Sequence, residues 1–349
     1  METTLLRRVL RKPLRGSLRQ VRHVRPVPPA RARGLVAEVY TRSEREFGML
    51  APPVALHSPA PEILAACWMM LRETLLTGGG PGRAVREAVA TGVSLGNACP
   101  YCAGVHGAAL GGLVPPEGGA RRDLAPVEEW ARASGTRGRA TPFPGEQAAE
   151  PVGVLVGVAV TFHYLNRMVN VFLDETPLPP RTPGMARGTL MRTLGRLMRP
   201  TGGGVEPGGS LDLLPMAPLP GDLSWAAGAP GVAGAFARAA SAIEAAGRRS
   251  VPGPVRDLLT ARLAAWDGGH PGLGGAWAEE AVADLAAEDR PAGRLALLTA
   301  FASYRVGEAD VDAFRESRGT GDRELVELTG WASMAAARTV GGWTRGESP

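Results

Sequence analysis

Cysteine is scarce in this sequence, which contains only Cys67, Cys99 and Cys102 in 349 residues. Three thiols cannot build the disulfide framework that stabilises small secreted domains, and disulfides persist mainly in oxidising compartments. We therefore expect the chain to fold around a hydrophobic core in a reducing compartment, the cytoplasm. A purely structural disulfide is not expected.

Motifs for cofactors and metals are also lacking. Neither a G-x-G-x-x-G nor a Walker A sequence is present, so nothing indicates a bound nucleotide or flavin. Haem attachment needs a histidine directly after the second cysteine of a CxxC pair, and Cys102 is followed by Ala103. A structural zinc site needs four ligands at suitable spacing, which the rest of the chain does not offer. We expect no metal and no cofactor.

Lysine is nearly absent, since Lys12 is the only one and the other basic residues are arginine. Residues 1–34 hold ten basic residues and one acidic residue, so this basic N-terminal arm largely produces the net charge of +5. The arm has no apolar run typical of a secretory signal, although its composition resembles a transit peptide or an anion-binding patch. No aromatic residues interleave the arginines, so we expect no nucleic-acid partner. We favour a short helix (Leu5, Val9, Leu10) packed on the protein's own acidic surface.

Period-2 alternation of apolar and polar residues is missing throughout, which predicts an all-α fold. Helices are expected on either side of a proline-rich break at 52–61. Cys67 lies among apolar residues in the second of them, and we interpret it as a buried core thiol.

The stretch 152–173 is long and apolar enough to raise the question of a membrane span. It also contains His163, Asn166, Arg167 and Asn170, which are costly in hydrocarbon and fall on one helical face. We therefore expect a buried helix with a polar stripe and no stable membrane span.

The stretch 83–110 carries the residues best suited to chemistry. Its first part predicts an amphipathic helix that Gly96 interrupts, and Asn97 is a good N-cap for a second helix. Cys99, Cys102 and His106 are then spaced by three and four residues, so they project from one stripe of that helix.

Such a stripe favours redox chemistry. A helix N-terminus and a nearby histidine both lower the pKa of a cysteine, and two cysteines on adjacent turns can close a disulfide. Glu87, on the preceding helix, could orient His106. An attacking thiol, a resolving thiol and a histidine–glutamate proton relay are the parts of a thiol peroxidase.

The pattern Glu87, Cys99, Cys102, His106 is E-x11-C-x2-C-x3-H. It resembles the signature of the alkylhydroperoxidase D and carboxymuconolactone decarboxylase superfamily. The resemblance implies that Cys102 is the peroxidatic thiol, that Cys99 resolves it, and that His106 and Glu87 form the relay. Some members of the peroxidase branch carry a second histidine between the cysteines, where this chain has Tyr101. Cys99, however, lies nearer the helix N-terminus and should feel its dipole more strongly.

The resemblance also implies a role for the apolar helix, which in the superfamily packs behind the cysteine helix. His163, Asn166 and Arg167 are then expected beside the site or its substrate pocket, with Tyr101. An alternative left open is that His163 and Asn166 form a hydrogen-bond network that serves stability alone.

The order of elements suggests an internal repeat with an offset of about 170 residues. Residues 60–67 match 229–236, 84–89 match 254–259, and 158–170 match 331–343. We therefore expect two tandem alkylhydroperoxidase D-like helical-bundle units, a catalytic one at 35–175 and a degenerate one at 223–345. A Pro/Gly-rich linker at 176–222 would join them.

The second unit lacks the active-site motif. Superposing the repeats puts Asp257 at the place of Glu87, but Gly269 and Gly272 replace the two cysteines and Ala276 replaces the histidine. This unit is expected to be a scaffold, and the chain is expected to form homo-oligomers.

Together these features predict an enzyme that reduces organic or hydrogen peroxide and is regenerated by an external thiol reductant. One alternative is a lyase of the decarboxylase branch, with His106 and Glu87 as acid and base and Arg167 holding a lactone carboxylate. Two thiols are not needed for that reaction. A third possibility is a non-enzymatic CxxC redox sensor.

Overall fold

The computed structural model describes residues 16–115, 119–139, 149–178, 182–198, 205–272 and 274–343. Within these ranges the chain forms helices and no β-strand, apart from an isolated bridge between Thr77 and Val205. The prediction of an all-α fold is confirmed. The expected helix at Leu5, Val9 and Leu10 lies outside the described residues.

The first half of the chain supplies the helices around the cysteine motif. They are α2 (Gly34–Glu46), α3 (Pro52–Ala55), α4 (Pro61–Leu71), α5 (Arg83–Gly96), α6 (Pro100–Leu113), α7 (Gly119–Asp123), α8 (Ala125–Ala133) and α9 (Ala149–Phe172).

The second half begins with one helix that packs back onto the first half and continues with a second group. These helices are α10 (Gly184–Leu197), α11 (Pro230–Ser250), α12 (Gly253–Ala264), α13 (Ala276–Val282), α14 (Arg290–Ala302), α15 (Glu308–Arg318) and α16 (Asp322–Trp343).

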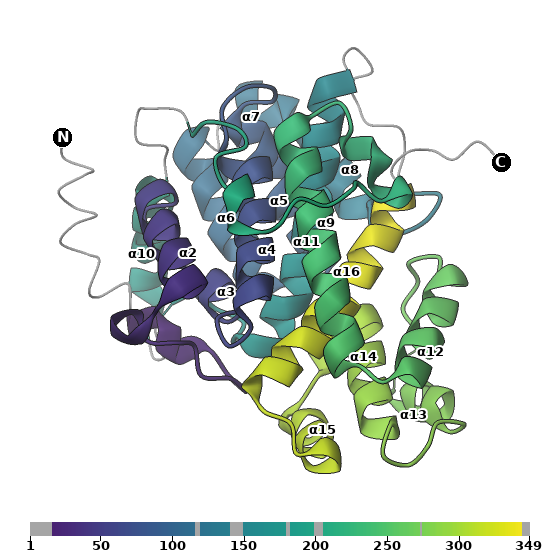
Figure 1. Ribbon diagram of the computed structural model, residues 1–349. Helices are drawn as coiled ribbons and strands as arrows, with labels where there is room; N and C mark the ends of the chain where they lie inside the picture. Colours follow the sequence, from purple (N-terminus) through teal and green to yellow (C-terminus); the bar gives the residue numbers. More distant parts are fainter. Residues whose placement is uncertain are drawn as a thin grey trace.

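Four helices, two from each half, form the centre of the molecule (Figure 1). Helix α4 packs against α11, α9 packs against α16, and α11 contacts α16. Large aromatic side chains are fully buried there, with Trp68 on α4, Phe162 and Tyr164 on α9, and Phe236 on α11. Burial of this apolar surface is the main favourable term in folding, so the two halves share one core.

The two helix pairs of the core, α4 with α11 and α9 with α16, correspond to segments that the expected repeat matches with each other. Residues 60–67 and 229–236 fall in α4 and α11, and residues 158–170 and 331–343 fall in α9 and α16. Each helix of the core therefore contacts the helix that the sequence offset assigns as its counterpart. The repeat itself, and the unit boundaries derived from it, stay predictions.

Helix α9 is the apolar segment that raised the question of a membrane span. Residues 152–172 are long and apolar enough to cross a membrane, judged by length and composition alone. However, 89% of an 18-residue window within them is buried inside the protein. His163, Asn166 and Arg167 are buried with it. The expected buried helix with a polar stripe is what the structure contains.

The described part of the N-terminal arm packs on the protein's own surface. Arg22 donates a hydrogen bond from its backbone N–H to the carbonyl of Phe172 at 2.8 Å, and its Nη2 donates to Leu173 O at 2.9 Å. The backbone N–H of Arg25 donates to Asp322 Oδ2 at 2.8 Å. These contacts tie residues 16–33 to the ends of α9 and α16.

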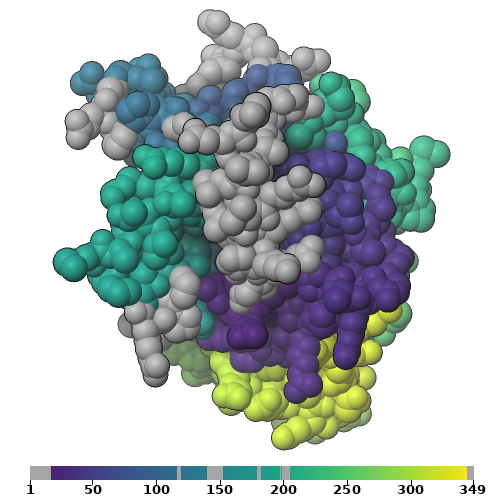
Figure 2. All heavy atoms as spheres, turned by 90° about the vertical axis from the view of Figure 1, so that its left-hand side faces the viewer, coloured from purple at the N-terminus to yellow at the C-terminus, as the bar shows by residue number. Residues whose placement is uncertain are grey.

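The segment 176–222, expected to be a linker, contains α10 and contacts the first half of the chain at two places. Helix α10 packs on α6 and lies at the surface on the same face as the N-terminal residues (Figure 2). Further along, Ser210 Oγ and the backbone N–H of Gly208 donate to the two oxygens of buried Glu73, each at 2.7 Å.

The contact between α10 and α6 depends on glycine. A Cβ added at Gly195 would lie 2.1 Å from the carbonyl oxygen of Ala108. We expect Gly195→Ala to push α10 away from α6 and to lower the free energy of unfolding by about 1–3 kcal/mol, the usual cost of overpacking. Urea denaturation, with amide exchange measured in α10, checks this.

Gly188→Ala is the matched control on the same helix. Its added Cβ would approach only the Arg192 side chain, at 3.5 Å. Alanine has the higher helix propensity, so this variant should be as stable as the wild type or more so. Equal destabilisation by both substitutions would contradict the proposed contact.

Candidate functional site

The turn between α5 and α6 sets the position of the two cysteines. Helix α6 begins at Pro100, with Cys99 as its N-cap residue, and Asn97 is the C-cap residue of α5. The prediction that Asn97 caps the second helix is therefore wrong. The Asn97 side chain is engaged elsewhere, because its Nδ2 donates to His163 Nδ1 and to Asn166 Oδ1, each at 3.0 Å.

Both cysteines of the motif are buried and reduced. The pKa of Cys102 is raised, first by burial and then by its hydrogen bond to Cys99 and by repulsion from that thiol, while Asn166 opposes the rise. The expectation of a lowered thiol pKa is thus wrong for Cys102 in this state, since burial disfavours the charged thiolate. The resting thiol keeps its proton and needs a base.

His106 and Glu87 form the expected pair. His106 Nδ1 lies 2.7 Å from Glu87 Oε2, and Glu87 is fully buried. Burial acts to raise the pKa of Glu87, but Arg83 and His106 hold it below its usual value. An ionised carboxylate can only accept a hydrogen bond, so Nδ1 carries the proton and Nε2 is left as the basic atom.

Arg83 completes this arrangement and was missed by the sequence reasoning. Its Nη2 and Nε lie 2.6 and 2.8 Å from Glu87 Oε1, so the guanidinium holds one carboxylate oxygen while His106 takes the other. The spacing of four residues on one helix is a signal that could have identified the pair.

A cavity of about 100 Å³ connects the reactive side chains. Tyr101, Cys102 and His106 line it from α6, whereas Cys99 does not. Its other walls are almost entirely apolar: Ser17, Phe47, Met49, Ala51, Pro52, Pro53, Val54, Leu71, Val105, Phe162, Leu165, Pro177, Leu194 and Met198. The cavity therefore presents one thiol and one imidazole to a small, largely apolar ligand.

His163 and Asn166 lie behind the cysteines in a hydrogen-bonded network. His163 Nε2 lies 2.9 Å from Ser134 Oγ, and Asn166 Nδ2 donates to Ser94 Oγ at 3.1 Å. Burial, assisted by the Arg167 charge, holds the pKa of His163 well below its usual value, so this ring is neutral. The network fixes the turn that carries Cys99.

Arg167 is placed differently from the other expected residues. It points toward the second half of the chain, where its Nε donates to Ala300 O at 2.9 Å, and it does not line the Cys102 cavity. Tyr101, His163 and Asn166 are thus brought to the cysteines, and Arg167 is not.

His57 and Cys67 are buried in the core. Burial raises the pKa of the Cys67 thiol, as expected for a core cysteine. His57 stacks on Tyr164, with 5.7 Å between ring centroids, and burial lowers its pKa to about 4. Neither side chain lines the Cys102 cavity.

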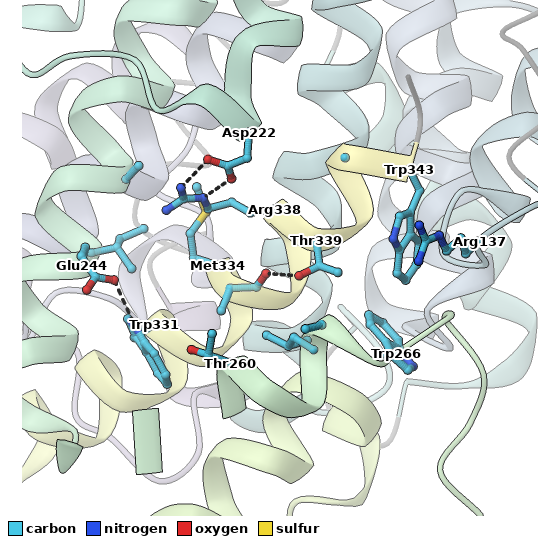
Figure 3. Close-up of a pocket in the computed structure, with 16 residues that line it drawn as sticks. Arg137, Asp222, Glu244, Thr260, Trp266, Trp331, Met334, Arg338, Thr339 and Trp343 are labelled. Carbon is cyan, nitrogen blue, oxygen red and sulfur yellow. Dashed lines mark hydrogen bonds and ion pairs between the residues drawn. The ribbon is translucent and has the colours of Figure 1, made fainter. Parts of the chain in front are cut away.

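A larger cavity of about 480 Å³ lies in the second half of the chain. Figure 3 shows Trp331, Met334 and Trp343 of α16 along its wall, with Trp266 facing them. Two of its charged groups are paired, since Arg338 forms two hydrogen bonds of 2.6 and 2.7 Å with Asp222. Among the described residues, no group of three or more His, Cys, Asp or Glu side chains could hold a metal ion.

Comparison with known proteins shows the family. The chain is 38% identical over 339 residues to a protein named alkyl hydroperoxide reductase from Mycobacterium tuberculosis, and the match covers 93% of this chain and 94% of the relative. The chain belongs to this alkyl hydroperoxide reductase family. No protein-family model matches it.

Membership of the alkyl hydroperoxide reductase family extends over both halves of the chain. A match over 93% of this chain includes most of each half, so the similarity is not confined to the cysteine motif.

The buried histidine makes the stability pH-dependent. His57 has a folded pKa of about 4 and an ordinary value of 6.5, so the unfolded chain binds the extra proton between these pH values. We expect His57 to reduce the free energy of unfolding by up to ~3 kcal/mol as the pH falls from about 6.5 to about 4. Urea titrations of wild type and His57→Gln across this range test it, and the variant should lose less stability on acidification. Parallel pH profiles would contradict the assignment.

Proposed function

We propose that this protein is a thiol-dependent peroxidase of the alkylhydroperoxidase D type, within the superfamily that includes carboxymuconolactone decarboxylase. One observation carries the proposal: Cys102 and His106 face the same small cavity, and His106 is bonded to a buried, ionised carboxylate. The family membership supports it, because the relative is named for alkyl hydroperoxide reduction.

In the first step, His106 Nε2 takes the proton of the Cys102 thiol, and the thiolate attacks the terminal oxygen of a hydroperoxide. The O–O bond breaks, Cys102 becomes a sulfenic acid, and the leaving alkoxide receives the proton to form an alcohol. Glu87 stabilises the imidazolium during the transfer, and Arg83 keeps Glu87 ionised. The relay thus supplies the base that the Cys102 thiol needs, because its raised pKa keeps it protonated at rest.

In the second step, the Cys99 thiol condenses with the sulfenic acid and releases water, which leaves a Cys99–Cys102 disulfide. The hydrogen bond between the two thiols supports this step, because it requires the side chains to be adjacent. An external thiol reductant then restores both thiols and is itself oxidised to a disulfide. No cofactor is needed.

The walls of the cavity support an organic hydroperoxide as the preferred substrate. Apart from Ser17, Tyr101, Cys102 and His106, its lining side chains are apolar. Burying an apolar substituent there contributes about 25 cal/mol per Å², which hydrogen peroxide cannot gain. The lyase alternative is not supported, because no arginine or lysine among the described residues lines the cavity to hold a lactone carboxylate and Arg167 lies elsewhere.

The second half serves, in this proposal, as a scaffold without chemistry of its own. Gly269 and Gly272, which replace the cysteines in the expected repeat, lie in the loop between α12 and α13, and Ala276 is the first residue of α13. A cytoplasmic location and a homo-oligomeric state also belong to the proposal.

The roles of the two thiols can be separated by mutation. Cys102→Ser should abolish peroxide consumption, whereas Cys99→Ser should still form a sulfenic acid on Cys102 but no disulfide. Cumene hydroperoxide consumption and dimedone trapping followed by mass spectrometry measure the two outcomes.

Cys67→Ser is the matched control, because this thiol is buried away from the cavity. It should keep the peroxidase activity and the disulfide. A dimedone adduct on Cys99 in the wild type would reverse the assignment of the attacking thiol.

The relay should be visible in the pH–rate profile. His106→Ala and Glu87→Gln are each expected to lower kcat/KM by about 10²-fold, the usual scale for a lost general base, and to shift the pH optimum upward. Arg83→Gln should have a smaller effect in the same direction, since Arg83 acts on the relay through Glu87 and does not line the cavity. Unchanged profiles in all three variants would show that the relay is not used.

A further inference from the structure

A third cavity, of about 210 Å³, lies behind the α5–α6 turn, where the first half of the chain meets the second. It shares no lining residue with the Cys102 cavity. The residues that line it are Gly96, Asn97, Arg132, Gly135, Thr136, Arg167, Trp266, Gly268, Gly269, His270, Ala300, Phe301, Ala302, Ser303 and Tyr304. They include three cationic or titratable basic side chains and no carboxylate.

Arg167 is the central group of this cavity. It is 7% exposed, and no carboxylate of the described residues lies within ion-pair distance of its guanidinium. Burial alone lowers the pKa of Arg167 to about 10. A buried charge without a partner is costly, so an anion in the cavity would remove an existing penalty.

The hydrogen bonds of Arg167 leave one donor nitrogen for such an anion. Its Nε donates to Ala300 O at 2.9 Å and its Nη1 to His163 O at 2.7 Å, while Nη2 has no partner among the described residues. The carbon of the guanidinium lies 5.9 Å from the centre of the Trp266 ring, which holds the plane in place. The Arg167 guanidinium is therefore held in place before a ligand binds.

Arg86, which is buried, and Arg338, which lines a cavity, provide a comparison. Arg86 is also buried without a carboxylate, but its three nitrogens donate to the carbonyls of Pro81, Thr77 and Gly79. Arg338, in the larger cavity, is paired with Asp222, as Figure 3 shows. Arg167 differs from both because its charge is unpaired and one of its nitrogens is unused.

The rim and walls indicate the kind of anion. Arg132 and His270 are exposed side chains of the lining, and the Arg132 charge adds positive potential. Trp266, Phe301 and Tyr304 offer aromatic faces to the body of a ligand. The unused Nη2 can donate a charge-assisted hydrogen bond to a carboxylate oxygen, and the aromatic walls suit an apolar or aromatic group attached to that carboxylate.

We propose that this cavity binds a small organic carboxylate whose charged end pairs with Arg167 and whose apolar body lies against Trp266 and Phe301. The site is distinct from the peroxide cavity, and its occupancy does not depend on the peroxidase reaction. Binding can therefore be tested on the reduced full-length protein without any activity measurement.

The test uses benzoate as the probe and neutral benzamide as its isosteric control, in calorimetric titration and in thermal unfolding. Benzoate should bind at millimolar concentration and raise the Tm, because a ligand that binds only the folded state stabilises it. Benzamide should do neither. Higher salt should weaken benzoate binding, because the Arg132 charge acts from the exposed rim.

Arg167→Gln should abolish benzoate binding. Arg132→Gln, at the exposed rim, should weaken it about 2- to 5-fold, the scale of an exposed ion pair. If Arg167→Gln does not fold, Arg132→Gln combined with His270→Ala takes its place and should weaken binding further. Arg187→Gln, an exposed arginine of α10 remote from the cavity, is the matched control and should change nothing.

Failure of benzoate to bind, or equal binding of benzamide, would overturn the proposal. Binding that Arg132→Gln and Arg187→Gln weaken equally would show only a general attraction of anions to the surface, and would also overturn it. Inorganic phosphate binding at Arg167 in the absence of benzoate binding would overturn the carboxylate assignment.

Discussion

Burial of α9 from both sides is the constraint on which the structure depends. The helix is covered by α5 on one side and by α16 on another, so its polar side chains must find partners inside the protein. His163 and Asn166 are satisfied by Asn97, Ser94 and Ser134 from the first half, whereas Arg167 reaches the backbone of the second half. One helix thereby holds the cysteine turn and joins the two halves.

The position of the two cysteines follows from this constraint. Asn97 is fixed by α9, so the turn that ends at Cys99 has a fixed place, and α6 extends from it with Cys102 and His106 toward the small cavity. Desolvation raises the pKa of the Cys102 thiol, while Arg83 and His106 keep the equally buried Glu87 ionised. In the proposed mechanism the same burial keeps the Cys102 thiol protonated while Glu87 stays ionised, so the thiol must give its proton to His106 before it can attack.

Helix α10 lies in a segment whose composition does not suggest a functional role, yet it contributes to the wall of the Cys102 cavity. Its glycine-mediated contact with α6 brings Leu194, and Met198 just after the helix, into the wall of the Cys102 cavity, which is small and mostly apolar. The Pro- and Gly-rich composition around α10 is typical of a linker. Close backbone packing at Gly195 gives it a structural role that composition alone does not indicate.

The sequence by itself determined the all-α class, the buried polar helix and the pairing of Glu87 with His106, because helical periodicity and motif spacing are local properties. It did not determine that Asn97 serves α9 instead of capping α6, that α10 covers the thiol, or that Arg167 faces a separate cavity. Those outcomes depend on which distant elements compete for a hydrogen-bonding group or a surface. Only the tertiary structure decides them, since burial and charge pairing are set by neighbours far away in the chain.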